Sequence, residues 1–233
     1  MCGRYSLVSR DPIQLRARFP VGETVELRRR FNIAPGDDIL TVTTTRDGAP
    51  RGELLRWGLL PPWVKDPRRS QKMINARAET LQERPAYRSA LERFRCLILA
   101  DGFYEWGRDE SGAKLPFHIT RADREPFAFA GLWSVWHRGE PDEVRSCTIV
   151  TTAANASIGP LHDRMPSILD RPGEDIWLDH GTPAPVLLDL LHSLPPSETA
   201  LRPVGPAVNN ARYDGPACLD DPPPASAPAA SLF

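Results

Sequence analysis

The feature that most limits the fold is a series of short apolar runs, rich in β-branched and aromatic residues, in the middle of the chain. Five such runs follow one another closely: Cys96–Ala100, Phe103–Trp106, Phe117–Thr120, Phe127–Trp136 and Arg145–Thr152. Runs of this length and composition are typical of β-strands. Many strands with few long helices predict an α+β protein with a curved, barrel-like and mostly antiparallel sheet.

A hairpin and several short helices are expected around these runs. The strand Asp38–Thr45 pairs with Glu53–Trp57 across Asp47-Gly48, a dipeptide that favours tight hairpin turns. Asp11 is a good cap for a helix that begins with proline. The peripheral helices predicted in this way are Pro12–Phe19, Ala78–Glu83, Ala86–Arg93, Pro172–Asp179 and Pro185–Ser193.

Length and composition predict one domain followed by a tail. The chain has 233 residues with 41% hydrophobic side chains, which is enough to bury a core without disulfides. Residues 214–233 are rich in proline and alanine, a composition typical of disordered chain. We therefore predict a domain over residues 2–213 and a disordered tail over residues 214–233.

Several classes of protein are excluded by what the sequence lacks. It has no apolar stretch of the length that crosses a bilayer and no apolar leader at its start, so we expect a cytoplasmic protein with no membrane contact. The four cysteines form no CxxC pair and no metal-ligand spacing. A disulfide scaffold, a bound metal and a cofactor are therefore not expected.

The charges are unevenly distributed although the net charge is only −1. Residues 1–108 carry 20 Lys and Arg against 13 Asp and Glu, whereas residues 109–233 carry 9 against 17. A positive face that suits a polyanion is one interpretation. Ordinary fluctuation of charge along a chain is the other, and the sequence does not decide between them.

Cys2 has unusual chemistry if Met1 is removed, which a small second residue usually permits. The residue then carries a free α-amine and a thiol on adjacent carbons. The amine has a reference pKa of about 7.7–8.0, against about 10.4 for lysine, so part of it is neutral and nucleophilic at pH 7. A 1,2-aminothiol reacts with an aldehyde to an imine, which the thiol then closes to a thiazolidine ring. The alternative is an incidental cysteine at a frayed terminus.

Glu105 and His162 are candidates for proton transfer. Glu105 lies between aromatic residues in the apolar segment GFYEW, where burial would raise its pKa and suit acid–base work. A surface carboxylate on a strand with alternating faces explains the pattern equally well. His162 opens the charged segment HDRMP, which suits proton transfer, although a histidine that bridges backbone groups is commoner.

The segment WGLLPPW places tryptophans and prolines in a loop. Bases stack on such rigid groups, and apolar wedges separate base steps. Core anchoring is the competing interpretation, and it is favoured more for Trp57 than for Trp63.

Seven short motifs together resemble the SRAP family, the SOS response-associated peptidases or abasic-site processing proteins. They occur in one order over about residues 2–212: MCGR (1–4), FNIAP (31–35), WGLLPPW (57–63), NARAE (75–79), GFYEW (102–106), FAGLW (129–133) and HDRMP (162–166). Each motif is weak alone, but the ordered set is specific.

The resemblance implies a suicide-type DNA repair protein. It would recognise an abasic site in single-stranded DNA and form a thiazolidine crosslink through Cys2, shielding the lesion. Glu105 would open the sugar ring and His162 would assist proton transfer at the sugar oxygen. Asn75 would hydrogen-bond the Cys2 end or the adduct.

The resemblance also implies a DNA-binding set. Arg4 and Arg77 match positions that hold phosphates, and Pro35 and Trp63 support a kinked strand. Val64 stands where some relatives carry a second tryptophan, so base stacking there stays open. The partners expected are abasic single-stranded DNA and replication-fork proteins, with the protein a monomer that joins the nucleoid when bound to DNA.

Two other functions are compatible with these residues. A processed N-terminal cysteine with Asn, Glu and His also suits an N-terminal-nucleophile peptidase or amidase that processes its own start. A non-enzymatic single-strand binder would use the Arg and Trp residues and leave Cys2 idle.

Overall fold

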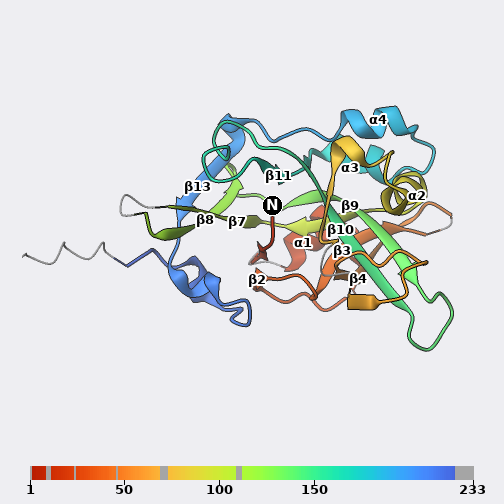
Figure 1. The fold of residues 1–233 in the computed structure, drawn as a ribbon, viewed down its shortest axis with the longest axis horizontal. Helices are drawn as coiled ribbons and strands as arrows, with labels where there is room; N and C mark the ends of the chain where they lie inside the picture. The colour runs from red at the N-terminus through yellow and green to blue at the C-terminus, as the bar shows by residue number, and fades with distance from the viewer. Residues whose placement is uncertain are drawn as a thin grey trace, which may run out of the picture.

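A computed structural model describes residues 2–8, 12–23, 25–45, 47–68, 73–108 and 112–223 of the chain (Figure 1). At its centre five strands form a closed barrel. Around the ring they are β10 (Val144–Ala153), β4 (Pro50–Trp57), β3 (Asp38–Thr44), β6 (Arg95–Ala100) and β9 (Phe127–Trp136), which pairs with β10 again. Within this ring β4 and β10 run parallel and the other neighbours antiparallel. The predicted α+β fold with a barrel-like, mostly antiparallel sheet is confirmed.

The strands β6 and β9 form the centre of the core. Every residue of both strands is buried, because one face fills the barrel and the other is covered by helices. Gly131 of β9 makes their close approach possible, since a Cβ there would lie 2.7 Å from the sulfur of Cys96. The apolar runs found in the sequence are therefore the strands with the most buried surface.

A second sheet packs beside the barrel, and a single residue, Asp101, connects it to the end of β6. Its strands, in spatial order, are β13 (Thr199–Pro203), β8 (Lys114–Arg121), β7 (Gly102–Arg108), β1 (Tyr5–Leu7) and β2 (Arg30–Ile33). Three short strands extend the barrel sheet: β5 (Asn75–Arg77) and β11 (Arg164–Pro166) pair with β10, and β12 (Ile168–Leu169) pairs with β9. The N-terminal strand thus lies inside a sheet, between β7 and β2.

The helices are short and peripheral, as expected. They are α1 (Pro12–Arg18), α2 (Pro85–Arg93), α3 (Arg171–Leu178) and α4 (Ala184–Asp189), with 3-10 turns η2 (Ala78–Thr80), η3 (Pro196–Glu198), η4 (Pro206–Asn209) and η5 (Pro216–Leu219). The carboxylate of Asp170 caps α3 by accepting a hydrogen bond from the Gly173 amide. The helix predicted over Ala78–Glu83 is a single 3-10 turn followed by irregular turns.

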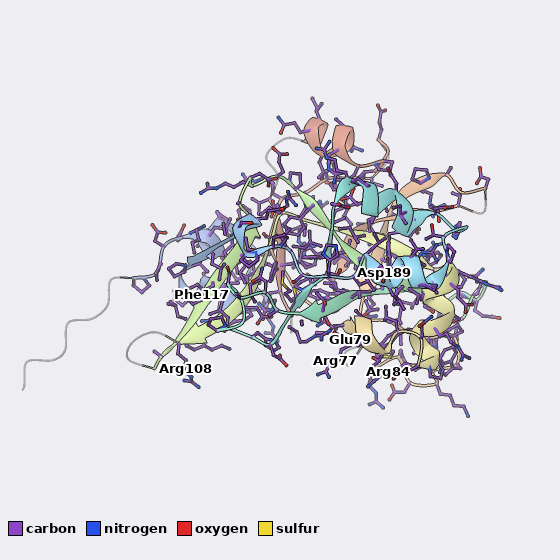
Figure 2. All side chains as sticks on the ribbon, turned by 90° about the horizontal axis from the view of Figure 1, so that it is seen from above. Arg77, Glu79, Arg84, Arg108, Phe117 and Asp189 are labelled. Atoms are coloured by element: carbon purple, nitrogen blue, oxygen red, sulfur yellow. The ribbon has the colours of Figure 1, made fainter. Side chains whose placement is uncertain are left out.

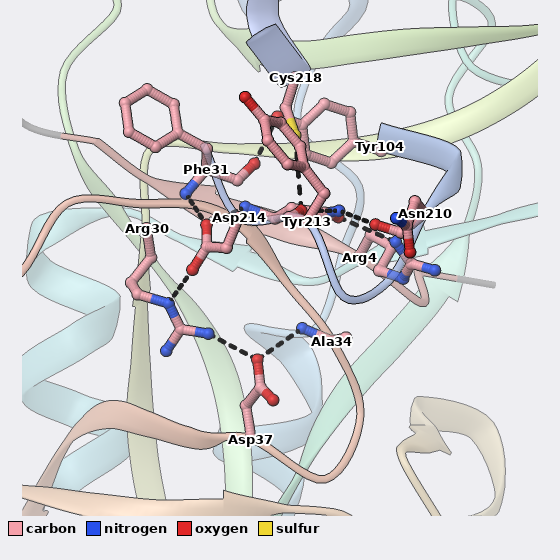
Figure 3. Close-up of polar contacts among 11 residues, drawn as sticks. Arg4, Arg30, Phe31, Ala34, Asp37, Tyr104, Asn210, Tyr213, Asp214 and Cys218 are labelled. Atoms are coloured by element: carbon pink, nitrogen blue, oxygen red, sulfur yellow. Dashed lines mark hydrogen bonds and ion pairs between the residues drawn. The ribbon is translucent and has the colours of Figure 1, made fainter. Parts of the chain in front are cut away.

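Residues 204–221, here called the C-terminal strap, return to the N-terminal sheet (Figure 3). Val204, Val208 and Cys218 of the strap are buried and pack with Phe31 and Tyr104 as a small second core. The fold therefore joins the two ends of the described chain.

Asp214 is the main polar anchor of the strap. Its carboxylate accepts hydrogen bonds from the backbone amides of Phe31, at 2.5 Å, and Asn32, at 2.8 Å, and pairs with Arg30 (Figure 3). The sequence prediction of a disordered tail from Asp214 is corrected for residues 214–223. Residues 224–233 of that predicted tail lie outside the described part of the chain.

Candidate active site

Cys2 lies just before β1 and is completely buried. Its thiol approaches the carbonyl oxygen of Arg4 at 3.6 Å, a weak hydrogen bond. Burial, reinforced by the negative charge of Glu105, raises the pKa of the Cys2 thiol far above its usual range. The thiol is therefore protonated at neutral pH.

Asn75 holds the backbone of Cys2. Its Nδ2 donates to the Cys2 carbonyl oxygen at 2.8 Å. Asn75 is placed there by β5, which runs parallel to β10 and sets residue 75 opposite Ile149. The Oδ1 of Asn75 is buried and accepts no hydrogen bond from the described residues. The side chain thus fixes Cys2 with its donor end and keeps an acceptor available.

Glu105 is the fourth residue of β7 and is 4% exposed. Burial raises the pKa of its carboxyl, and the positive charges of the amino terminus and of His162 act in the opposite direction. The raised pKa predicted from the aromatic neighbours is confirmed. Glu105 acts electrostatically on Cys2, and His162 acts on Glu105. Because salt screens exposed charges beyond about 10 Å, these effects indicate that the three residues lie near one another.

His162 lies in the loop before β11 and is partly exposed. The amide N–H of Arg164 donates to its Nδ1 at 2.9 Å, and the Asp163 carboxylate lies 2.9 Å from the same atom. A backbone N–H always donates, so Nδ1 accepts in the neutral ring and Nε2 then carries the proton. The Asp163 contact becomes attractive when the ring is protonated. His162 is therefore held by its Nδ1 contacts, with Nε2 left to donate.

The four side chains come from four separate segments, and we call them the Cys2 cluster: Cys2, Asn75, Glu105 and His162. Two of their segments are tied together by Arg164, whose guanidinium donates to both carboxylate oxygens of Glu79, at 2.7 and 2.9 Å, and to the Thr151 carbonyl oxygen. The sequence suggested a proton-transfer role for the whole HDRMP segment, but Arg164 is a buried structural link. The glutamate of NARAE and the arginine of HDRMP were the sequence signal for the Glu79–Arg164 ion pair.

The two arginines predicted to hold phosphates have different surroundings. Arg4 is directed inward: its Nη1 donates to the Asn32 Oδ1 and to the Val208 carbonyl oxygen of the strap, each at 2.9 Å. Arg77 ends β5 and is exposed, and within the described residues it forms no ion pair. Figure 2 shows Arg77 and Arg108 projecting along the same side of the molecule.

The apolar residues predicted to support DNA are separated by burial. Trp57 is 1% exposed and belongs to the core, whereas Trp63 is 57% exposed. Pro35 is exposed in the turn between β2 and β3. The indole of Trp136 donates to the Val64 carbonyl oxygen at 2.6 Å and fixes the loop behind Trp63. None of the contacts described here joins Pro35 or Trp63 to the Cys2 cluster.

A second polar cluster, absent from the sequence predictions, lies on the same sheet. We call it the Ser6 cluster: Ser6, Asp101 and His118. The Ser6 hydroxyl donates to Asp101 at 2.7 Å and lies 2.9 Å from His118 Nε2. Burial, with the charge of Arg202, lowers the pKa of His118 to about 3.

The packing of His118 against Gly102 and Tyr104 is tight. A Cβ on Gly102 would lie 2.2 Å from His118 Nε2, and the Tyr104 ring lies 4.9 Å from the imidazole centroid. His118 and Asp101 also line a pocket of about 620 Å³. Tyr104 and Glu105 are neighbours on β7 and therefore point to opposite faces of the sheet. His118, which contacts Tyr104, thus packs on the face opposite to Glu105.

The described part of the chain has neither a metal-ligand cluster nor a membrane-spanning helix. It contains no group of three or more His, Cys, Asp and Glu side chains arranged to hold a metal ion. Its helices are all too short or too polar to cross a membrane.

A buried cysteine near a carboxyl of raised pKa and an imidazole, on the sheet that packs beside the closed barrel, is a candidate reactive site. The chain belongs to the SOS response associated peptidase (SRAP) family, whose model matches residues 1–211. The ordered motifs of the sequence predicted this family, and the prediction is confirmed.

Curated relatives support the same assignment, and a solved structure shares the fold. The chain is 38% identical over 226 residues to the abasic site processing protein YoqW of Bacillus subtilis, covering 94% of this chain and 99% of the relative. It is 43% identical to YoaM of the same organism, which bears the same description, covering 83% and 85%. A crystal structure from Bacteroides thetaiotaomicron shares the fold with a TM-score of 0.82 at 23% identity, covering 94% and 99%.

Proposed function

We propose that this protein processes abasic sites in single-stranded DNA by forming a covalent thiazolidine crosslink through Cys2 after Met1 is removed. The observations that support the proposal are the hydrogen bond of Asn75 to the buried Cys2 and the charge of the partly exposed His162 acting on the buried Glu105. The curated relatives are described as abasic site processing proteins, which supports an abasic site as the substrate.

The reaction begins with the sugar. An abasic deoxyribose is mostly a closed hemiacetal, and opening it requires proton removal from the C1′ hydroxyl and protonation of the ring oxygen. The raised pKa of Glu105 suits both transfers, because a carboxyl that titrates closer to neutrality exchanges protons more readily. Glu105 therefore supplies the aldehyde on which the next step depends.

Crosslinking then joins Cys2 to C1′ in two steps. The amine nitrogen adds to the aldehyde carbon, and the carbinolamine loses water to give an imine. The sulfur next bonds to C1′ while the thiol proton passes to the imine nitrogen, which closes the five-membered ring. One water is released and nothing is oxidised or reduced. Because the thiol is protonated before the reaction, the amine attacks first.

Asn75 and His162 assist this sequence. Asn75 holds the Cys2 carbonyl, and its buried Oδ1 is an acceptor for the amine N–H as the adduct forms. His162, with a proton on Nε2 in the neutral ring, donates to the sugar oxygen and takes that proton back when the crosslink is reversed. Glu105 thereby starts ring opening, and His162 handles the proton on the sugar oxygen.

The DNA is held by local charge, because the net charge of the protein is −1. Arg77 is exposed beside Asn75 on β5 and contacts a phosphate next to the lesion. Arg4 steadies the start of β1 from inside, and Pro35 and Trp63 support the bend of the strand. We expect Arg77→Ala to weaken binding to single-stranded DNA and to flatten its salt dependence by about 0.7 per lost phosphate contact.

The deciding experiment is incubation of the protein with an abasic oligonucleotide without reductant, followed by denaturing electrophoresis. The wild type is expected to give a heat-resistant adduct, and Cys2→Ala is expected to give none. The intact mass of the protein should first show that Met1 is absent, because a retained methionine blocks the amine. A heat-resistant adduct of Cys2→Ala at wild-type yield would refute the thiazolidine.

A self-processing peptidase is the second candidate, favoured by the name of the family and by the position of Cys2. It predicts that Cys2→Ala, Glu105→Gln or Asn75→Ala retains Met1 when expressed in cells, whereas wild-type protein loses it. If all variants lose Met1 equally, a separate aminopeptidase is responsible and the peptidase function is excluded.

A further inference from the structure

A pocket of about 470 Å³ adjoins the Cys2 cluster and has no role in the mechanism above. Trp106, Gly107 and Arg108 of β7, Lys114 of β8, and Pro160 and Leu161 of the following loop line it. Trp106 follows Glu105 directly and Leu161 precedes His162 directly. The pocket therefore shares its strand with Glu105 and its loop with His162, although Trp106 itself points to the opposite face of β7 from Glu105.

The lining of this pocket combines apolar walls with positive charge. Trp106 is fixed by a hydrogen bond from its indole nitrogen to Asn209 Oδ1 at 2.7 Å. The Lys114 ammonium lies 4.9 Å from the centre of the Trp106 ring. Among the described residues that line the pocket, none is acidic. A planar apolar group joined to an anion suits such a lining, and a nucleotide has both parts.

Gly107 determines the shape of one wall. A Cβ at this position would lie 2.7 Å from Leu161 Cδ2, so glycine allows the loop that carries His162 to rest on β7. A larger residue would push Leu161 away and move His162 with it. The pocket and the Cys2 cluster thus share one loop.

The positions of the cations relate the pocket to the proposed path of DNA. Arg77 on β5 and Arg108 on β7 project along the same side of the molecule (Figure 2). They belong to different sheets, β5 to the barrel and β7 to the sheet that contains β1. Two phosphates of one strand that passes over Cys2 can therefore be bound on the two sides of the lesion.

We propose that this pocket binds the nucleotide next to the abasic site on the side away from Arg77. The base stacks on Trp106, and Lys114, whose flexible stem lets it leave the ring, binds the neighbouring phosphate together with Arg108. This inference rests on the proposed function, since it requires that DNA enters the Cys2 site.

The test uses three oligonucleotides that carry a tetrahydrofuran analogue, which lacks the aldehyde, so that binding is measured without crosslinking. One has nucleotides on both sides of the analogue, one only on its 5′ side and one only on its 3′ side. The double variant Arg108→Gln/Lys114→Gln is compared with Arg93→Gln/Arg171→Gln, which removes two exposed cations from α2 and α3.

We expect the pocket variant to weaken binding by about tenfold, with a shallower salt dependence, for the two-sided DNA and for one of the one-sided DNAs. The other one-sided DNA should bind as it does to wild type, and the control variant should change nothing. Equal losses for all three DNAs, or no loss for any, would overturn the proposal.

Stacking on Trp106 is tested separately because this residue also packs against the small second core. Trp106→Phe should retain the affinity of wild type for the same DNAs, and Trp106→Leu should lose about tenfold, with thermal unfolding measured for both. Equal binding by the two variants would exclude stacking. If wild-type protein binds as expected but forms no adduct with abasic DNA, the proposed function fails and the pocket stands.

Discussion

The Cys2 cluster and the Ser6 cluster are built from the same kinds of group, and each has members on the sheet that contains β1 and β7. Each brings together a side chain that can act as a nucleophile, a carboxyl and an imidazole. In the Ser6 cluster the hydroxyl donates to Asp101, so the serine proton is not directed to His118, and the imidazole is 7% exposed. In the Cys2 cluster His162 reaches solvent and Glu105 keeps a raised pKa.

The comparison shows that residue types alone do not define a reactive site. Gly102 and Tyr104 pack closely against His118, although His118 and Asp101 also line a pocket of about 620 Å³. Burial there holds His118 neutral and makes the cluster a rigid joint between β1 and β7. The other cluster differs in its partly exposed imidazole, His162, and in the raised pKa of Glu105.

The largest expected effect is on the rate of crosslinking. Glu105→Gln should slow it about 10²–10⁴-fold while DNA binding is kept, because the side chain keeps its size but no longer exchanges a proton. Single-turnover rates at saturating protein measure this. Asp101→Asn is the matched change in the Ser6 cluster and should crosslink at the wild-type rate. A slow Asp101→Asn with an unaffected Glu105→Gln would invert the comparison.

The second effect is on stability in acid. His118 has its pKa lowered to about 3 in the folded protein, so the unfolded chain takes up a proton as the pH falls below about 6.5 and the folded protein does not. Stability should therefore decline between about pH 6.5 and pH 3, by at most about 5 kcal/mol from this group. His118→Gln should reduce this decline in urea unfolding, and His180→Gln, at an exposed histidine, should not.

A smaller effect is expected at His162. His162→Ala should slow crosslinking by about tenfold, less than Glu105→Gln, since water substitutes for the imidazole once the aldehyde is open. Release of DNA from the purified adduct should slow as well, because His162 takes the proton back from the sugar oxygen in that direction. His192→Ala, at another exposed histidine, serves as control. If His162→Ala abolishes crosslinking while Glu105→Gln leaves it unchanged, the two roles are exchanged.

The smallest effect is a gain in stability. The pKa of Glu105 is raised by burial, so its contribution to stability is complete below about pH 4.5 and is lost as the pH rises through the folded value. Gln resembles the protonated form at every pH. Glu105→Gln should therefore be more stable than wild type at pH 7–8, by about 0.5–2 kcal/mol, and equal to it near pH 4. An advantage that grows toward acid would contradict the raised pKa.

Much of the barrel could be predicted from the sequence because its strands are long and apolar. The runs that became β6, β9 and β10 were recognised, and so was the hairpin of β3 and β4. The strands β1, β5 and β11 have three residues each, too few for any periodicity to appear. Their pairing is decided by distant parts of the chain.

The site was predicted in its parts but not in its arrangement. The aminothiol chemistry of Cys2 and the raised pKa of Glu105 follow from the residues, whereas Asn75 came from the family resemblance. Nothing local shows that β5 lies parallel to β10 and brings Asn75 to Cys2. The Ser6 cluster was missed for the same reason, since Asp101 and His118 are both far from Ser6 in sequence.

The C-terminal strap has a consequence for the order in which the protein is made. Arg4 is held by the Val208 carbonyl, 204 residues later, and Asn32 donates to the carbonyls of Asn210 and Tyr213. At about 5–20 residues per second, at least about ten seconds of synthesis separate Arg4 from its partner. During that interval the start of the chain has not reached its final position. An enzyme that removes Met1 has this period in which to act, before Cys2 is enclosed.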